Sequence, residues 1–211
     1  MCEGKRDRIF VEETLRNRIN LEPSKIKNFE EPRLLERAIT FGERVPVLIC
    51  DGNGFPGNTR VAVRLSCKFM RYAKSICMGV VGDSDRGSVY GETIAYLTSY
   101  LGTPCKAHAI HPQITKLDSD LKATISFDSS NRVTFWTFEV PNSLEARISE
   151  VLKSNYTELT DCCNEEEVLS RATEVLGTDE EGVVRRSVSL FQDETWFNSF
   201  CNRAGASMDL Y

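Results

Sequence analysis

Two aspartates, Asp83 and Asp85, stand one residue apart directly after an apolar run at residues 76–81. A short apolar run of this kind predicts a buried strand, and ligands of open α/β sheets bind beyond the carboxyl ends of the strands. Carboxylate oxygens are the ligands that Mg²⁺ prefers, with phosphate oxygens and water completing its shell. The two aspartates therefore predict a divalent-cation site, while the same spacing also occurs in ordinary turns and helix caps.

Four basic residues follow one another at helical spacing in a stretch, residues 52–82, that contains no Asp or Glu; they are Arg60, Arg64, Lys68 and Arg71. On a helix this spacing brings them to one face. One interpretation is a surface that contacts the phosphates of DNA. The other is the solvated face of an ordinary helix.

The composition of the 211-residue chain argues against several other classes of protein. A net charge of −5 argues against binding nucleic acid through overall charge, so a basic surface has to be local. The eight cysteines include no C-x-x-C pair that would indicate a zinc or redox site. No G-x-x-x-x-G-K-[ST] phosphate loop is present, and no apolar run approaches the ~20 residues that span a bilayer. We expect an intracellular protein with reduced cysteines.

Strands and helices alternate along the first half of the chain. Strands are expected at residues 25–29, 45–50, 76–81, 123–127 and 132–138, and helices at 32–41, 59–74, 89–101, 143–153, 165–176 and 183–208. This order predicts an α/β fold in which crossover helices connect parallel strands. We expect an N-terminal arm or linker at residues 1–24, a core at 25–105, and a C-terminal part of the same domain at 106–211.

The residues around two of the expected strand ends resemble a known family. Residues 47–56, V-L-I-C-D-G-N-G-F-P, are followed by Thr59-Arg60 and resemble that family's apolar strand, glycine-rich loop and T-R pair. Residues 79–85, G-V-V-G-D-S-D, are followed by Tyr90-Gly91 and resemble the strand that ends in its D-x-D motif. Both segments are similar to the Toprim domain of topoisomerase VI A subunits and of the meiotic recombination proteins related to them.

This resemblance implies a Toprim-like (Rossmann-like) parallel sheet with flanking helices and a C-terminal α+β extension. It also implies Mg²⁺, with Mn²⁺ as an alternative, held by Glu30, Asp83 and Asp85 as the catalytic residues; Glu31 and Glu12 are the rivals of Glu30. DNA would lie along the four basic residues. The implied activity is that of a type IIB topoisomerase-like DNA transesterase that forms double-strand breaks. It would act in meiotic recombination in the nucleus of a eukaryote, or in the cytoplasm of an archaeon.

The chain departs from the family most clearly in its tyrosines. In the family, a winged-helix domain before the Toprim domain supplies the tyrosine that attacks DNA, whereas no tyrosine precedes Tyr72 here. We therefore expect a homodimer or a partner subunit that carries the nucleophile. Two alternatives remain: a Toprim metal-dependent nuclease, which needs no tyrosine, and a degenerate domain that only binds DNA or a protein partner.

Overall fold

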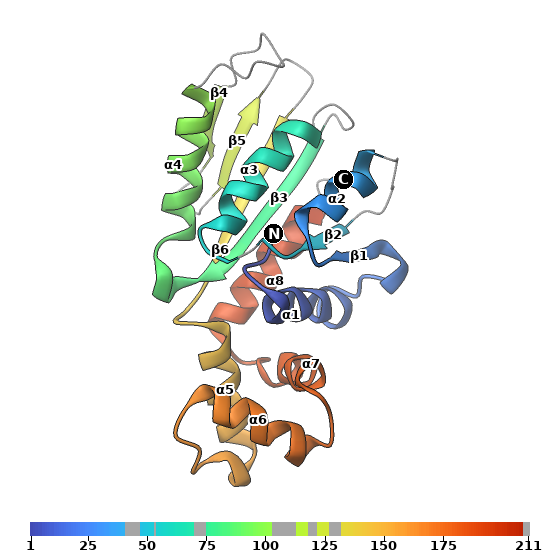
Figure 1. Cartoon of the computed structure of the whole chain (residues 1–211), viewed down its shortest axis with the longest axis vertical. Coiled ribbons are helices and arrows are strands. Elements are labelled where there is room, and N and C mark those ends of the chain that lie inside the picture. Colours follow the sequence, from blue (N-terminus) through green and yellow to red (C-terminus); the bar gives the residue numbers. More distant parts are fainter. Residues whose placement is uncertain are drawn as a thin grey trace.

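The structure, a computed structural model, describes residues 1–40, 47–52, 54–69, 75–102, 113–117, 122–126 and 132–208, and it has an α/β fold (Figure 1). Its helices are α1 (Lys5–Asn17), α2 (Pro32–Thr40), α3 (Gly57–Phe69), α4 (Val89–Gly102), α5 (Leu144–Asn155), α6 (Glu165–Leu176), α7 (Glu180–Leu190) and α8 (Thr195–Met208). Short 3₁₀ turns are η1 (Pro23–Lys25), η2 (Ser84–Arg86) and η3 (Thr157–Leu159).

The described strands form two sheets. Strands β1 (Ile26–Phe29) and β2 (Val47–Cys50) pair in parallel. The second sheet has the order β3-β6-β5-β4 and contains β3 (Ser75–Asp83), β4 (Gln113–Leu117), β5 (Lys122–Ser126) and β6 (Arg132–Val140). Strand β3 runs parallel to β6, whereas β5 is antiparallel to both β6 and β4. The α/β class and the expected strands are confirmed, and the second sheet is mixed rather than wholly parallel.

The first two residues of the chain lie between the two sheets. The terminal amino group of Met1 donates to the carbonyl of Gly79 at 2.6 Å, and the N–H of Val81 donates to the carbonyl of Met1 at 2.9 Å. On the other side, the N–H of Cys2 donates to the carbonyl of Cys50 at 2.9 Å. Residues 1 and 2 thus connect β2 to β3 and continue the parallel pairing, since Cys2 forms a parallel bridge with Asp51.

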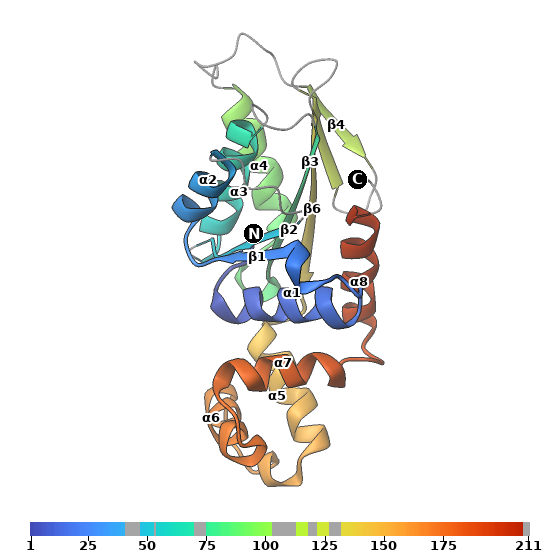
Figure 2. The ribbon, with the colours of Figure 1, turned by 90° about the vertical axis from the view of Figure 1, so that its right-hand side faces the viewer.

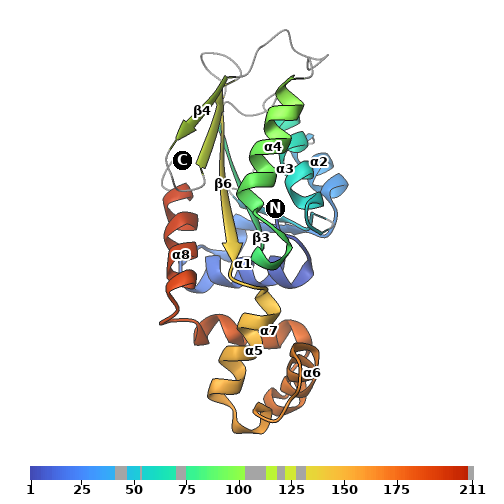
Figure 3. The same ribbon diagram turned by 90° about the vertical axis from the view of Figure 1, so that its left-hand side faces the viewer.

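The expectation of an N-terminal arm at residues 1–24 is therefore wrong. Helix α1 follows the inserted segment, and its Ile9, Phe10 and Leu15 side chains are buried. The sequence is misleading here because residues 3–8 are almost all charged, although Glu3, Asp7 and Arg8 are themselves buried. Figures 2 and 3 show α1 crossing the sheet region rather than projecting from it.

Alternate residues of β3 and β6 pack into different cores, as the period of two of a strand requires. Val80 and Phe135 belong to a core with α3 and α4, whereas Val81 and Trp136 belong to a core with α1 and α8. Figures 2 and 3 show α2, α3 and α4 on one side of the sheet and α8 on the other. The sheet is thus covered on both faces.

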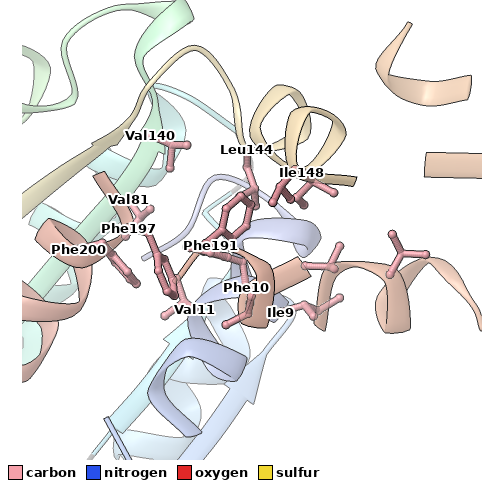
Figure 4. Packing of buried hydrophobic residues seen from close by; sticks show 14 of the residues in the cluster. Ile9, Phe10, Val11, Val81, Val140, Leu144, Ile148, Phe191, Phe197 and Phe200 are labelled. Carbon is pink, nitrogen blue, oxygen red and sulfur yellow. The ribbon is translucent and has the colours of Figure 1, made fainter. Parts of the chain in front are cut away.

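An aromatic cluster joins α1 to the C-terminal helices (Figure 4). The fully buried ring of Phe10 lies with its centroid 5.5 Å from that of Phe200, 5.8 Å from Phe197 and 6.2 Å from Phe191. These aromatic contacts anchor the C-terminal segment on α1. The single helix expected at residues 183–208 is instead two helices, because a polar turn at residues 192–194 separates α7 from α8.

Helices α5, α6 and α7, with η3, form a helical lobe at residues 144–190, seen below the sheet in Figure 1. Each of these helices begins at a side-chain cap. Ser143 accepts from the N–H of Ala146 at 3.1 Å, and Asn164 and Asp179 cap α6 and α7 in the same way. Such caps satisfy backbone donors that have no partner within the helix. Helices α5 and α6 begin within one residue of their expected starts, whereas α7 begins at Glu180, three residues before the expected start.

Candidate metal centre

Asp83 is the last residue of β3, and its carboxyl group is buried at the carboxyl edge of the sheet. Its Oδ1 accepts the N–H of Leu144, the first residue of α5, at 3.0 Å. Asp85 lies two residues further on in η2 and is exposed. The predicted placement of the two aspartates beyond an apolar strand is therefore confirmed.

Glu3 directly follows the segment inserted beside β3 and is also buried. Its Oε2 lies 3.4 Å from the backbone nitrogen of Asp83, which donates to it. A Cβ placed on Gly82 would lie 3.5 Å from the same Oε2 atom. The carboxylate of Glu3 thus lies against the end of β3, beside the backbone of Asp83.

Asp7 contributes a further buried carboxyl group from the first turn of α1. Its Oδ2 accepts the N–H of Gly4 at 3.0 Å and caps the helix. Its Oδ1 is buried and has no hydrogen-bond partner. An unpartnered buried carboxylate oxygen is costly and is a feature expected of an atom that binds a ligand.

The negative charge of Glu145, in the first turn of α5, also acts on the buried acids. Burial raises the pKa of Asp83 from 3.8 to about 7; the Leu144 N–H opposes this shift, whereas the negative charges of Glu145, Glu3 and Asp85 add to it. The pKa of Asp7 is raised well above its ordinary value, chiefly by burial and then by the charges of Asp83 and Glu145. We call Glu3, Asp7, Asp83, Asp85 and Glu145 the acidic cluster.

The chemistry of the acidic cluster fits a divalent cation. It offers only carboxylate oxygens, the ligands of Mg²⁺ and Mn²⁺, and the negative charges of its other members add to the effect of burial in raising the pKa of Asp7 and of Asp83. Within the described residues, no three His, Cys, Asp or Glu side chains are already grouped as a metal-holding set. The oxygens of Asp83 and Glu3 are instead turned toward backbone N–H groups.

The structure does not bring Glu30, the expected third ligand, to this cluster. Glu30 follows β1, which is separated from β3 by β2 and the inserted residues 1 and 2. Its side chain is 78% exposed and lies 3.8 Å from Arg8. The rival Glu12 is buried in ion pairs with Arg16 and Arg185 on the opposite part of α1, and the other rival, Glu31, directly follows Glu30 beyond β1.

Glu3, Asp7 and Glu145 were missed because their role depends on long-range placement. Met1 and Cys2 are too few to be recognised as a strand, so Glu3 could not be seen as a residue that ends one. The available signal was local: an acid followed by glycine directly precedes a helix whose first turn contains Asp7. For Glu145, no sequence signal separates it from the other acids that begin the lobe helices.

The glycine-rich loop places α3 beside the acidic cluster. Asn58, fully buried in the first turn of α3, donates from Nδ2 to the carbonyl of Val81 at 3.0 Å. A Cβ at Gly52 would lie 2.3 Å from the Cβ of Asn58, so only glycine permits this approach. The Phe55–Pro56 peptide bond in this loop is cis. Helix α3 therefore begins at the edge of the sheet where β3 ends.

The expected basic stripe is present on α3 in part. Arg60, Arg64 and Lys68 are exposed, but Lys68 pairs with Glu36 of α2. Arg71 lies outside the described residues. Arg60 is in the first turn of α3, so it is the member of the stripe nearest in the helix to the edge that carries the acidic cluster.

Free thiols in the described part of the chain are found at Cys2, Cys50, Cys77, Cys162, Cys163 and Cys201. This agrees with the expectation of reduced cysteines. No helix in the described ranges is long and apolar enough to cross a membrane.

Comparison with known proteins returned no match: no family model fits the chain, and neither a curated protein nor a solved structure is significantly similar to it.

Proposed function

We propose that the chain is a Toprim-like, Mg²⁺-dependent enzyme that cleaves phosphodiester bonds in DNA by hydrolysis. The observation that carries this proposal is the acidic cluster, in which Glu3, Asp7 and Asp83 are buried together at the carboxyl edge of the sheet and Asp7 retains an unpartnered oxygen. Burying several carboxyl groups together is unfavourable when they are ionised, and a bound cation would offset this cost at a pH where they lose their protons. The resemblance of residues 79–85 to a D-x-D strand end supports the same assignment.

Within this proposal Glu3, Asp7 and Asp83 hold the cation, with Asp85 and Glu145 at the exposed side of the cluster. A bound Mg²⁺ supplies charge stabilisation for the phosphoryl group and an activated water. Asp83 must be ionised to hold the cation, and because its pKa is about 7 without a bound cation, binding should strengthen as the pH rises through neutrality.

The exposed arginines of α3 orient the nucleic acid in this proposal. Arg60 and Arg64 lie on one face of the helix that begins beside the cluster. Contacts with phosphates position a duplex without reading its sequence. Arg60 also lies in the first turn of α3, where backbone N–H groups favour an anion.

The test is cleavage of supercoiled plasmid with Mg²⁺ or Mn²⁺ by the wild type, Asp83→Asn and Asp7→Asn, with Glu30→Gln as the matched acid outside the cluster. We expect nicks with free ends from the wild type and Glu30→Gln, and none from the other two variants. Equal cleavage by wild type and Asp83→Asn would refute the proposal.

A second candidate is the transesterase implied by the resemblance of residues 47–60 to the glycine-rich loop and T-R pair of the topoisomerase VI family. It requires a tyrosine from a partner, either a second copy or another subunit. The same reaction stopped with detergent distinguishes the two, because a transesterase leaves protein covalently attached to the DNA ends. A degenerate binding domain would instead bind DNA equally well after Asp83→Ala and Asp85→Ala. Action in meiosis and a nuclear location remain predictions.

A further inference from the structure

Three hydrogen bonds attach the start of α5 to the D-x-D segment, one from the first residue of the helix and two at Asn142, which precedes its cap. Leu144 donates its N–H to Asp83 at 3.0 Å, Asp85 donates its N–H to the carbonyl of Asn142 at 3.1 Å, and the N–H of Asn142 donates to the hydroxyl of Ser84 at 2.9 Å. Figure 4 shows Leu144 beside the aromatic residues that pack on α1. The helical lobe therefore begins at the acidic cluster itself.

One residue of α1 reaches the beginnings of two lobe helices at once. Arg6 lies between Glu3 and Asp7 in the sequence, and its Nη1 donates to Oε1 of Glu145 at 2.9 Å. Its Nε donates to Oε1 of Glu180 in the first turn of α7. The guanidinium thus connects the acidic cluster, through Glu145, to a helix end remote from it.

A guanidinium is suited to this bridge because its donors point in fixed, different directions. An ammonium group offers a single point charge and would serve one carboxylate at a time. Arg6 and Glu145 are both about three-quarters shielded by their surroundings, with 31% and 26% of each side chain exposed. This partial burial distinguishes the contact of Arg6 with Glu145 from the neighbouring pair of Lys5 with Glu181, in which the side chains are 61% and 42% exposed. Glu180, at the other end of the bridge, is 54% exposed.

We propose that Arg6 is a positioning residue: by bridging Glu145 and Glu180 it fixes the first turn of α5, and so the Leu144 N–H and the Glu145 carboxylate, against Asp83. The part of this role in which Glu145 and Asp83 bind a cation rests on the proposed function. The positioning of α5 against Asp83 does not depend on that function.

Amide hydrogen exchange at Leu144, measured without added cation, tests the positioning directly. We expect Arg6→Gln to speed exchange of this amide by roughly five- to tenfold, as local opening becomes easier. Arg6→Lys, which retains the charge without the bridge, should give an intermediate rate. Lys5→Gln is the matched control from the same helical turn and should leave the rate unchanged. An unchanged rate in Arg6→Gln overturns the proposal whether or not the protein binds metal.

Mn²⁺ titration by calorimetry gives a second readout, because the direction of the change in Mn²⁺ affinity distinguishes a positioning residue from a mere counter-charge. If Arg6 positions Glu145, Arg6→Gln weakens Mn²⁺ binding, whereas a mere counter-charge would, once removed, tighten it. Glu180→Gln removes the far anchor without changing the cluster, and we expect a smaller weakening in the same direction. Tighter binding by Arg6→Gln refutes the positioning role. Absence of Mn²⁺ binding by the wild type refutes the proposed function instead, and the exchange rates then decide on Arg6.

Discussion

The sheet with its covering helices and the helical lobe at residues 144–190 differ in what holds them and in what they carry. The lobe contains eleven Asp and Glu residues against five Lys and Arg, and its helices begin at local side-chain caps. The sheet region is held by contacts between distant parts of the chain, such as Met1 with Gly79. Most of the acidic cluster lies in the sheet region, and the lobe adds only Glu145.

This difference shows that acidic residues form a candidate site when they are buried beside the end of a strand. A large number of acidic residues in one segment is not sufficient. Glu165, Glu166 and Glu167 are consecutive acids at the start of α6, yet all are exposed and suit the helix dipole. Glu3 and Asp83 are 80 residues apart in the sequence, yet they are buried side by side. The following changes test whether chemistry and stability divide between the two regions in this way.

The largest expected effect is on catalysis. Asp83→Asn should lower the rate of Mg²⁺-dependent cleavage by more than about 100-fold, since it removes a charged ligand from the centre. Glu166→Gln, an exposed acid of the lobe, should leave the rate unchanged. Initial rates of plasmid nicking measure both. A comparable loss in Glu166→Gln would break the distinction between the two regions.

The next largest effect is on stability. Phe10→Ala should lower the free energy of unfolding by about 3–5 kcal/mol, because the ring is fully buried among aromatic residues of α8 and Phe191, which follows α7. Leu169→Ala, a buried change within the lobe, should cost about 2–5 kcal/mol. Urea denaturation should show a single transition in both variants, because one continuous core joins α1 to the lobe. Two separate transitions would mean that the lobe unfolds on its own.

A smaller effect concerns pH. The pKa of Asp83 is about 7 in the folded chain and 3.8 in its ordinary state, chiefly because of burial. The folded protein therefore holds a proton that the unfolded chain releases, and this contribution to stability is lost as pH rises from about 4 to about 7. Asp83→Asn should raise the melting temperature at pH 8 and leave it nearly unchanged below pH 4.

Thermal unfolding at several pH values, with and without Mg²⁺, measures this dependence. Mg²⁺ should stabilise the wild type at pH 8 more than at pH 5, because binding needs the ionised carboxyl group. The exposed lobe variant Glu166→Gln should follow the wild type throughout. A melting temperature of Asp83→Asn below that of the wild type at pH 8 would contradict the assigned cause of the shift.

The smallest effect concerns DNA affinity. Arg60→Ala and Arg64→Ala should each weaken binding a few-fold and reduce the slope of log K against log salt concentration by about 0.9. Lys68→Ala should change both less, because Lys68 already pairs with Glu36. Fluorescence anisotropy across a salt series measures the slopes. Equal slopes for all three variants would favour the interpretation of the stripe as a solvated helix face.

The parts of the fold that the sequence predicts are those specified locally. The strand before Asp83, the helix after the glycine-rich loop, and the capped helices α5 and α6 were expected close to their observed bounds. The separation of α7 from α8 was missed because the intervening residues 192–194 are polar but contain neither proline nor glycine.

The site was predictable only where a ligand follows a recognisable strand. Asp83 and Asp85 met that condition. Glu3 did not, because the strand before it consists of two residues whose hydrogen bonds are all made with distant strands. Glu30 was the third ligand that the family resemblance implied, yet strand order in space sets it apart from β3. Sequence order does not reveal which strands are neighbours.

The most direct test of the acidic cluster is Mn²⁺ titration by calorimetry on the wild type, Glu3→Gln and Glu30→Gln. These two variants remove the same charge, one from the buried end of the inserted strand and one from an exposed position beyond β1. We predict saturable binding by the wild type and Glu30→Gln, and binding weakened at least about tenfold or lost in Glu3→Gln. Loss of binding in Glu30→Gln with retention in Glu3→Gln, or no binding by the wild type, would contradict the account.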